Sequence, residues 1–369
     1  MRESQDVYLA RLHRAQGAAG EQGIGAILVT PGSDLRYLTG YDAKPLERLT
    51  CLVVEPGREP WLVVPRLELL AAASSPVVQA GIEVLTWEET EDPYALVAER
   101  LGSAARIAVD NHMWAEKVFR LRDQLPDVHL ESAGSIIEAM RLIKDAAEVA
   151  SLIAAGQAID AVHSQVPSIL RPGLTEEQVG TRIAELILEA GHVAVDFVIV
   201  ASGPNAASPH HDVSERVLQM GDSVVVDIGG TMPDGYRSDC TRTYHLGEPT
   251  ATYRERYDIL EAAQRLAVES VRPGVTCESI DATARDHMSR SGLAELFIHR
   301  TGHGIGLESH EEPYIVRGNA TPVVAGMAFS IEPGFYDEGH HGARIEDIVV
   351  VTDEGCISVN NRPHELVIV

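Results

Sequence analysis

Four carboxylates in the C-terminal part of the chain are spaced as two pairs, and they are the residues best suited to carry chemistry. The first pair, Asp227 and Asp239, flanks the turn TMPDG between two apolar stretches. If these stretches form an antiparallel hairpin centred on Pro233, the two carboxylates lie directly opposite each other, about 4.5–5.5 Å apart. Like charges in that position destabilise a hairpin, so we expect a cation between them.

The second pair, Glu332 and Glu346, repeats this arrangement around Gly339. His303 lies among the glycines of TGHGIGLESHEEP, where the backbone can pass close to a bulky group. Four carboxylates balance two divalent cations, and an imidazole can complete the ligand set. Two such ions about 3.5–4 Å apart can hold a nucleophilic hydroxide and polarise a carbonyl. Oxygen donors with one nitrogen favour manganese, cobalt or zinc without deciding among them. The alternative is that these acids lie on solvent-exposed faces of strands.

The overall composition limits the partners that the chain can have. It has 369 residues, a net charge of −25 and a pI of about 4.9, which argues against nucleic acid and anionic membranes. It contains neither an apolar run long enough to span a bilayer nor the apolar core of a signal peptide. Its four cysteines are scattered, so neither a zinc motif nor a disulfide framework is expected. We therefore expect a cytoplasmic protein.

The elements before residue 140 alternate between strand and helix patterns, which predicts an α/β domain. Pro, Gly and charged residues between two apolar runs predict a hairpin. The turn PGS is expected to follow the first strand directly, and residues 36–48 are expected to form a loop. The expected helices cover 1–24, 92–101 and 113–125, and the expected strands cover 26–30, 49–57, 60–68, 77–87, 106–111 and 128–137.

A second domain is predicted to open with a long helix after a boundary at residues 141–144. Asp145 followed by Glu148 is typical of a capping box, and an apolar stripe at helical spacing follows it. Further on, residues 169–191 resemble residues 270–292. Both segments carry an RPG turn, a threonine suited to cap a helix, and a helix that ends at glycine.

The offset of about 100 residues between these two segments persists downstream and predicts an internal duplication. It relates His210 to His310, and it relates the first carboxylate pair to the second. Each half is expected to place a pair of helices on an antiparallel hairpin. His303 has no such partner, because Ser202 lies near the equivalent place. A chance recurrence of turn motifs is the alternative.

The motifs VVVDIGG, SDCTRT, HRTGHGIGLESHEEP, SIEPGFY and ARIEDIVVVT resemble those of the pita-bread metallopeptidases. This family includes Xaa-Pro dipeptidases (prolidases), aminopeptidase P and methionine aminopeptidases, and the resemblance is greatest to an actinobacterial-type Xaa-Pro dipeptidase. It implies an α+β fold, with a catalytic pita-bread domain of pseudo-twofold symmetry at residues 141–369. A smaller creatinase-like α/β domain is implied at residues 1–140.

The resemblance also implies roles for individual residues. His210 and His310 would bind substrate and steady the tetrahedral intermediate, and Glu332 would relay the proton, with Glu346 as the alternative. Arg344 matches the arginine of an R-x-E motif, and His299 matches a further histidine around the substrate. The implied metal ligands are Asp227, Asp239, His303, Glu332 and Glu346.

Other residues are assigned less directly by the same resemblance. Arg317 or Arg344 would bind the free carboxylate of a dipeptide. The alternatives are that Arg317 is a solvated loop arginine and that Arg344 instead braces the acids around the metals. Arg36, Tyr41 and Arg48 are candidates to reach the site of a partner subunit, because the family implies a homodimer. Cys240 stands where the family has methionine, and its side chain should point away from the face of Asp239. His211 does not match the family pattern, and we expect it to be exposed.

The function implied is hydrolysis of Xaa-Pro dipeptides by two divalent ions, with manganese expected and cobalt or zinc as alternatives. Aminopeptidase P activity on longer Xaa-Pro peptides is the nearest alternative. Creatinase and non-catalytic binding proteins share the fold but lack the ligand set that is complete here. An ordinary α/β binding module with surface acids is the remaining alternative.

Overall fold

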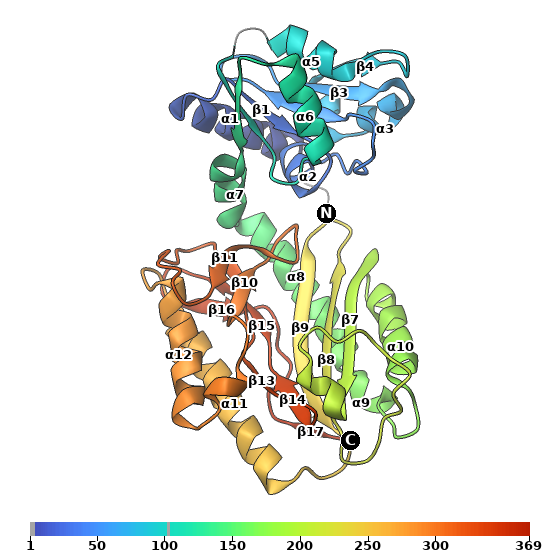
Figure 1. Cartoon of the computed structure of the whole chain (residues 1–369), viewed down its shortest axis with the longest axis vertical. Helices are drawn as coiled ribbons and strands as arrows, with labels where there is room; N and C mark the ends of the chain where they lie inside the picture. The colour runs from blue at the N-terminus through green and yellow to red at the C-terminus, as the bar shows by residue number, and fades with distance from the viewer. Residues whose placement is uncertain (1–3, 102–103) are drawn as a thin grey trace. The chain divides into compact units, whose positions relative to one another are not determined.

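The computed structural model describes residues 4–101 and 104–369, so the first three residues of the helix predicted at 1–24 lie outside the described part. The chain folds into two compact units, Met1–Arg141 and Leu142–Val369, and Figure 1 labels the elements of each. No helix in the described ranges is long and apolar enough to cross a membrane.

The N-terminal unit is built on a six-stranded sheet of order β4-β3-β2-β1-β5-β6. The strands β1 (Ala26–Val29), β2 (Cys51–Val54) and β3 (Trp61–Pro65) are antiparallel neighbours, which confirms the predicted hairpin. Parallel pairs add β4 (Glu83–Trp87), β5 (Arg106–Val109) and β6 (His129–Ser132). The helices of this unit are α1 (Gln5–Glu21), α2 (Ser33–Thr39), α3 (Leu69–Ala73), α4 (Pro76–Gln79), α5 (Pro93–Leu101), α6 (Ala115–Gln124) and α7 (Gly134–Leu142).

Three predictions for this unit were wrong. In the strand predicted at 77–87, residues 77–79 belong to the helix α4, and the strand β4 begins only at Glu83. Residues 36–39, predicted to lie in a loop, belong to the helix α2, which follows the turn at Pro31, buries Leu35 and Leu38 and ends at Gly40 with φ +66°. The strand predicted at 128–137 stops at Ser132, whose hydroxyl accepts a hydrogen bond from the backbone of Gly134 and so begins α7 instead.

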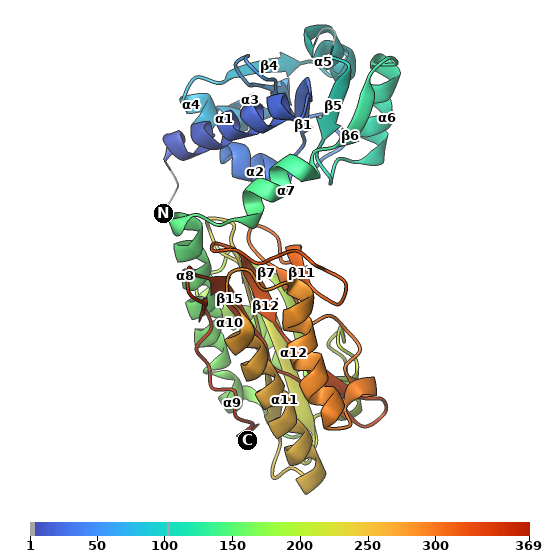
Figure 2. The same cartoon turned by 90° about the vertical axis from the view of Figure 1, so that its left-hand side faces the viewer.

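The C-terminal unit contains three antiparallel-rich sheets and two sets of helices. In Figure 1 the strands lie between α10 and α12, and Figure 2 shows α11 and α12 side by side. The strand orders are β17-β9-β8-β7, β11-β10-β12-β15-β16 and β13-β14. The helices are α8 (Ala146–His163), α9 (Val166–Ile169), α10 (Glu176–Glu189), α11 (Ala251–Ser270) and α12 (Cys277–Arg290). The strands are β7 (Ala194–Ser202), β8 (Ser223–Thr231), β9 (Arg237–His245), β10 (Gly302–Gly304), β11 (Glu311–Ile315), β12 (Ala328–Ile331), β13 (Gly334–Asp337), β14 (His341–Arg344), β15 (Asp347–Val351), β16 (Cys356–Ser358) and β17 (Val367–Ile368).

The helix starts predicted in this unit are confirmed. Asp145 and Glu148 form a full capping box at the start of α8. Thr175 caps α10 and Thr276 caps α12, each by accepting a hydrogen bond from the backbone three residues on. Each of these two threonines also forms an isolated β-bridge, to Val217 and to Pro322 respectively. The two halves of the duplication therefore begin with the same local structure.

Candidate metal centre

The first carboxylate pair lies on the two long strands β8 and β9. Asp227 is paired with Thr241, and Asp239 is paired with Gly229, so the hairpin is centred one residue beyond Pro233. The prediction of directly opposed carboxylates was wrong, because the turn is centred on Asp234, where Gly235 adopts a left-handed φ of +97°, and Thr231 pairs with Arg237 rather than with Gly235. The two carboxylates share a face as diagonal neighbours, which leaves more room between them than direct opposition would.

The second pair follows the predicted register. Ile331 pairs with Asp347, and Gly334 pairs with Arg344, so the hairpin is symmetric about position 339. Glu332 and Glu346 lie in the breaks between these short strands rather than within them. The backbone of Glu346 instead forms a bridge to Thr241 of β9, and its Oε2 accepts a hydrogen bond of 2.7 Å from the Thr241 hydroxyl. This bridge joins the two halves of the duplication at the carboxylates.

His303 reaches the carboxylates because the glycines beside it allow close packing. A Cβ on Gly302 would lie 1.8 Å from the carbonyl oxygen of Ser330, so no larger residue fits there. The Nε2 atom of His303 lies 3.2 Å from Glu332 Oε1 and 3.7 Å from Asp239 Oδ2. Donor atoms of three buried residues lie within 4.8 Å of one another, namely Asp239, His303 and Glu346.

The charge in this cluster is poorly balanced by the protein itself. Burial raises the pKa of Asp227, Asp239 and Glu346, and neighbouring carboxylates raise each of them further. The Oδ1 atom of Asp227 is buried and has no hydrogen-bond partner. A buried carboxylate oxygen without a partner is costly, and bound cations would supply the missing partner and charge. The residues present therefore fit a site for divalent metal ions.

Glu332 and His303 form a strongly paired couple among the expected metal ligands. Burial opposes the ionisation of Glu332, but the hydrogen bond and charge of His303, together with the charges of His299 and Arg344, outweigh burial and lower the pKa of Glu332 to about 2. Burial likewise lowers the pKa of His303, and the same contact with Glu332 raises it to above its ordinary value. In the protein without metal, this pair is therefore an ion pair that metal binding would have to replace.

Arg344 is fully engaged by side chains around the carboxylates. It donates from Nη2 to Asp227 Oδ2 (2.5 Å), from Nη1 to the Tyr336 hydroxyl (2.8 Å) and from Nε to the Thr241 hydroxyl (3.2 Å). Only 2% of the residue is exposed. These contacts brace Asp227, which is the predicted alternative to binding the carboxylate of a substrate.

His299 also uses both of its ring nitrogens within the protein. In the neutral ring Nδ1 must carry the proton, because the carbonyl oxygen of Arg300 beside it can only accept, and Nε2 therefore accepts from the Tyr336 hydroxyl, 2.8 Å away. His299 Nδ1 then donates to the carbonyl of Arg300 at 2.6 Å. Burial lowers the pKa of His299 to about 4, which agrees with a neutral ring. The described contacts leave no ring N–H with which His299 could bind a substrate.

His210 and His310 are placed differently from the buried residues. Both remain accessible to solvent, and the ring centroid of His310 lies 4.1 Å from that of His303. Partial burial and the charge on His303 lower the pKa of His310 to about 4. His210 is close enough for its charge to lower the pKa of both His299 and His310. His310 thus lies beside His303 at the edge of the carboxylate cluster, and His210 lies within electrostatic range of it.

The remaining predicted residues do not join the cluster by any described contact. Arg317 is exposed after the end of β11. In the N-terminal unit, Arg36 lies on α2 rather than in a loop and pairs with Asp42 at 3.0 Å. Arg48 pairs with acidic side chains of the same unit, and Tyr41 is buried there.

Two predictions about neighbouring residues have opposite outcomes. Cys240 belongs to the apolar core on the side of the sheet away from Asp239, as predicted. His211 is not exposed: 17% of its side chain is accessible, and its Nε2 lies 2.8 Å from Glu176 Oε2. The buried carboxylate of Glu176 explains this difference, because it accepts a hydrogen bond from the His211 ring.

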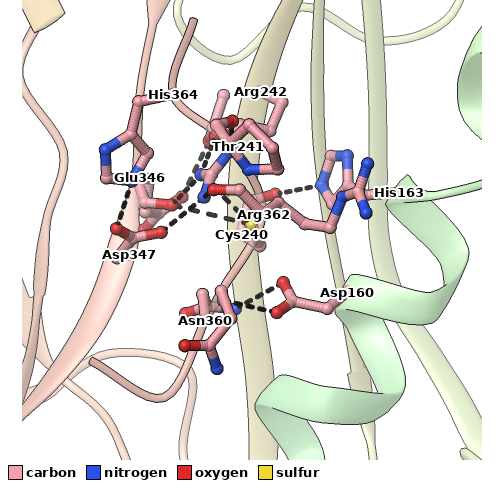
Figure 3. Close-up of polar contacts among 12 residues, drawn as sticks. Asp160, His163, Cys240, Thr241, Arg242, Glu346, Asp347, Asn360, Arg362 and His364 are labelled. Carbon is pink, nitrogen blue, oxygen red and sulfur yellow. Dashed lines mark hydrogen bonds and ion pairs between the residues drawn. The ribbon is translucent and has the colours of Figure 1, made fainter. Parts of the chain in front are cut away.

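A buried network behind Glu346 was not predicted from the sequence, and Figure 3 shows it. Arg242, on β9, donates from Nη1 to the carbonyl of Glu346 (2.7 Å) and from Nη2 to Asp347 Oδ1 (2.7 Å). The same guanidinium donates to the carbonyls of Arg362 (2.7 Å) and Pro363 (3.0 Å). One side chain therefore joins a strand of the first half to the segment that carries Glu346 and to the C-terminal residues.

Comparison with known proteins agrees with this geometry. Residues 150–353 match the family model Metallopeptidase family M24, and residues 11–143 match the Creatinase/Prolidase N-terminal domain. The chain is 50% identical over 365 residues to the "Probable dipeptidase PepE" of Mycobacterium tuberculosis, over 99% of this chain and 97% of that protein. It is 36% identical over 346 residues to the Xaa-Pro dipeptidase of Lactobacillus helveticus, over 91% of this chain and 92% of that protein.

A solved structure gives the same result. The crystal structure of dipeptidase PepE from Mycobacterium ulcerans matches with a TM-score of 0.96 at 53% sequence identity, covering 100% of both chains. The predicted resemblance and fold class are therefore confirmed. The chain is an enzyme of metallopeptidase family M24, with a Creatinase/Prolidase N-terminal domain before its catalytic domain.

Proposed function

We propose that this enzyme hydrolyses the Xaa-Pro bond of dipeptides, with two divalent cations held by Asp227, Asp239, His303, Glu332 and Glu346. The observation that carries the proposal is the convergence of four carboxylates and one imidazole at a single buried place, with an unpaired oxygen on Asp227. The relatives named Xaa-Pro dipeptidase and dipeptidase support the substrate class. Manganese is the proposed metal, and the proposed assembly is a homodimer in the cytoplasm.

The bound metals would supply an activated water and would polarise the scissile carbonyl. Side chains of the protein would stabilise the developing charge and transfer the proton. His310, whose pKa is lowered to about 4, is neutral at pH 7 and can donate one ring N–H to the charge that develops on the substrate. His210, within electrostatic range of His310, would donate a second hydrogen bond. Each such donor contributes about 2.7–4 kcal/mol to transition-state stabilisation.

Glu332 is the residue that we assign to proton transfer. Its Oε1 atom accepts a hydrogen bond from the Ser330 hydroxyl (2.9 Å). Oε2 is therefore the atom that would take a proton and pass it to the proline nitrogen, which must be protonated as it leaves. Arg344 and His299 would act by orienting Asp227 and Tyr336 rather than by touching the substrate.

A panel of Ala-Pro and Ala-Pro-Ala, assayed with manganese, cobalt and zinc, tests the substrate. Efficient cleavage of Ala-Pro supports the proposal. Cleavage of the tripeptide alone would refute it and would favour an aminopeptidase P. A protein that binds metal but cleaves neither peptide would refute both.

A further inference from the structure

A single buried carboxylate organises the segment that carries His210. Glu176 follows the capping residue of α10 and is fully buried. Every hydrogen bond described for its carboxylate comes from residues 202–214. The donors are the Ser202 backbone (2.7 Å), the Ser202 hydroxyl (2.7 Å), Asn205 Nδ2 (3.1 Å), His211 Nε2 (2.8 Å) and the Ser214 hydroxyl (2.6 Å).

These donors make the carboxylate an anion despite its burial. Burial alone would raise the pKa of Glu176, but hydrogen bonds from Ser202, Ser214 and His211 outweigh burial and lower it. An ionised carboxylate in this place is stable only if its oxygens are satisfied. The positions of its donors are therefore fixed together, and a change in one of them disturbs the others.

The segment has little other regular structure to hold it. Between the end of β7 and the start of β8 it contains only one short 3-10 helix, Gly203–Ala207. A second layer anchors its ends, because Arg216 pairs with Asp222 at 2.7 Å and donates to the Ser202 hydroxyl. Within the segment, His210 lies directly beside His211, one of the donors to Glu176.

We propose that Glu176 is a positioning residue for His210: it holds His211, Ser214, Asn205 and Ser202 around one carboxylate and so fixes the imidazole at the edge of the metal centre. This inference rests on the proposed function only in the role that it gives to His210. The pinning of the segment is a property of the protein whatever it hydrolyses.

The test uses Glu176→Gln in the full chain, with Glu177→Gln as the matched control, because Glu177 is the next residue of the same helix and is exposed. The amide keeps the shape of the side chain but turns one acceptor into a donor, which opposes the donors around it. Hydrogen exchange measured by mass spectrometry should show faster exchange in peptides covering 202–214 for Glu176→Gln and unchanged exchange for Glu177→Gln. Ser214→Ala removes one donor and should give a smaller increase in the exchange rate of the same peptides. It replaces Glu176→Gln in this test if that variant does not fold.

Catalysis supplies the second measurement. Glu176→Gln should lower kcat/KM by about 10- to 100-fold, as expected for a small misplacement of a catalytic group, with metal content unchanged. In a His210→Ala background the same change should cost less than about twofold, because its effect acts through His210. An equal loss in both backgrounds, or unchanged exchange in the segment, overturns the proposal. If the wild type cleaves no Xaa-Pro peptide, the proposed function fails, while the exchange measurement still decides whether Glu176 pins the segment.

Discussion

The two halves of the C-terminal unit place their carboxylates by different means. In the first half, Asp227 and Asp239 lie within unbroken nine-residue strands. In the second half, Glu332 and Glu346 lie in the breaks between strands of four or five residues. A regular ladder fixes the first pair, whereas individual contacts to other segments fix the second.

The halves also differ in what they add to the acids. By strand register, His303 stands opposite Ser330, two residues before Glu332, and the corresponding place in the first half is Ala201, opposite Val225. The sequence offset had indicated Ser202, one residue away. A methyl group cannot bind a metal, so the first half supplies only carboxylates to the centre. The two cationic side chains that contact these acids in the described part of the chain, His303 and Arg344, come from the second half.

The comparison predicts that the centre depends most strongly on the imidazole of the second half. His303→Ala should abolish stable metal binding and lower turnover by more than about 100-fold, the upper end of the loss caused by disturbing residues around metal ligands. Metal analysis of the purified protein and turnover of Ala-Pro measure this together. If His303→Ala keeps full turnover without bound metal, the centre does not depend on the imidazole of the second half.

The next largest effect should come from Arg344, because it is the partner of a buried acid in the other half. Arg344→Met leaves Asp227 buried without its counter-charge and should lower the free energy of unfolding by about 3–5 kcal/mol. Asp227→Asn in the same protein should restore part of the loss.

Arg256→Met is the matched control for this change. Arg256 pairs with Asp337 at 2.6 Å, but both side chains are partly accessible, so its loss should cost at most about 1 kcal/mol. Denaturant unfolding of the metal-free proteins measures both variants. Equal destabilisation by the two substitutions would show that the halves do not depend on this ion pair.

The buried histidine of the second half should make stability depend on pH. The pKa of His299 is about 4 in the folded protein and about 6.5 in an unfolded chain. Between these values the unfolded chain binds a proton that the folded protein does not, so stability is lost as the pH falls from 6.5 to 4. The loss is at most about 3.4 kcal/mol. His299→Gln should lose less stability over this range than the wild type.

His340→Gln, at an exposed position in the same half, is the control for the loss of one histidine. Urea unfolding of the metal-free proteins at several pH values provides the measurement. If His299→Gln and the wild type show the same dependence on pH between 7 and 4, the neutral ring inferred for His299 is wrong.

The smallest effect should come from the helix caps, where the halves are most alike. Thr175→Ala and Thr276→Ala should each lower the free energy of unfolding by about 1 kcal/mol. Thr175→Ala should cause the larger loss of unfolding free energy, because Gln178 completes a capping box with Thr175. Only the single cap bond is described at Thr276. Paired thermal unfolding curves would show the order, and a larger loss for Thr276→Ala would contradict it.

The sequence predicted the parts of this unit that depend on local pattern. Helix starts at Asp145, Thr175 and Thr276 follow from residues within one turn of each other, and the register about position 339 follows from alternation in short strands. The first hairpin was placed one residue off, because the turn type depends on a backbone angle at Gly235 that the sequence pattern does not reveal.

Contacts between distant residues could not be predicted in the same way. His211 was expected to be exposed, because nothing near it in the chain indicates the carboxylate of Glu176, 35 residues earlier. The role of Arg242 is hidden for the same reason, since its partners lie more than 100 residues away. The helix α2 has only seven residues, which is too few for a helical repeat of apolar residues to be recognised in the sequence.

The ion pair between Arg344 and Asp227 has a consequence for how the chain is made. These residues are 117 positions apart, and Thr241 and Glu346 are 105 apart. A ribosome adds about 5–20 residues per second, so Arg344 emerges on the order of ten seconds after Asp227. During that interval the first hairpin carries two acids that it cannot bury, because their counter-charge has not yet been synthesised. The catalytic unit must therefore complete its fold as a whole, late in translation, rather than half by half.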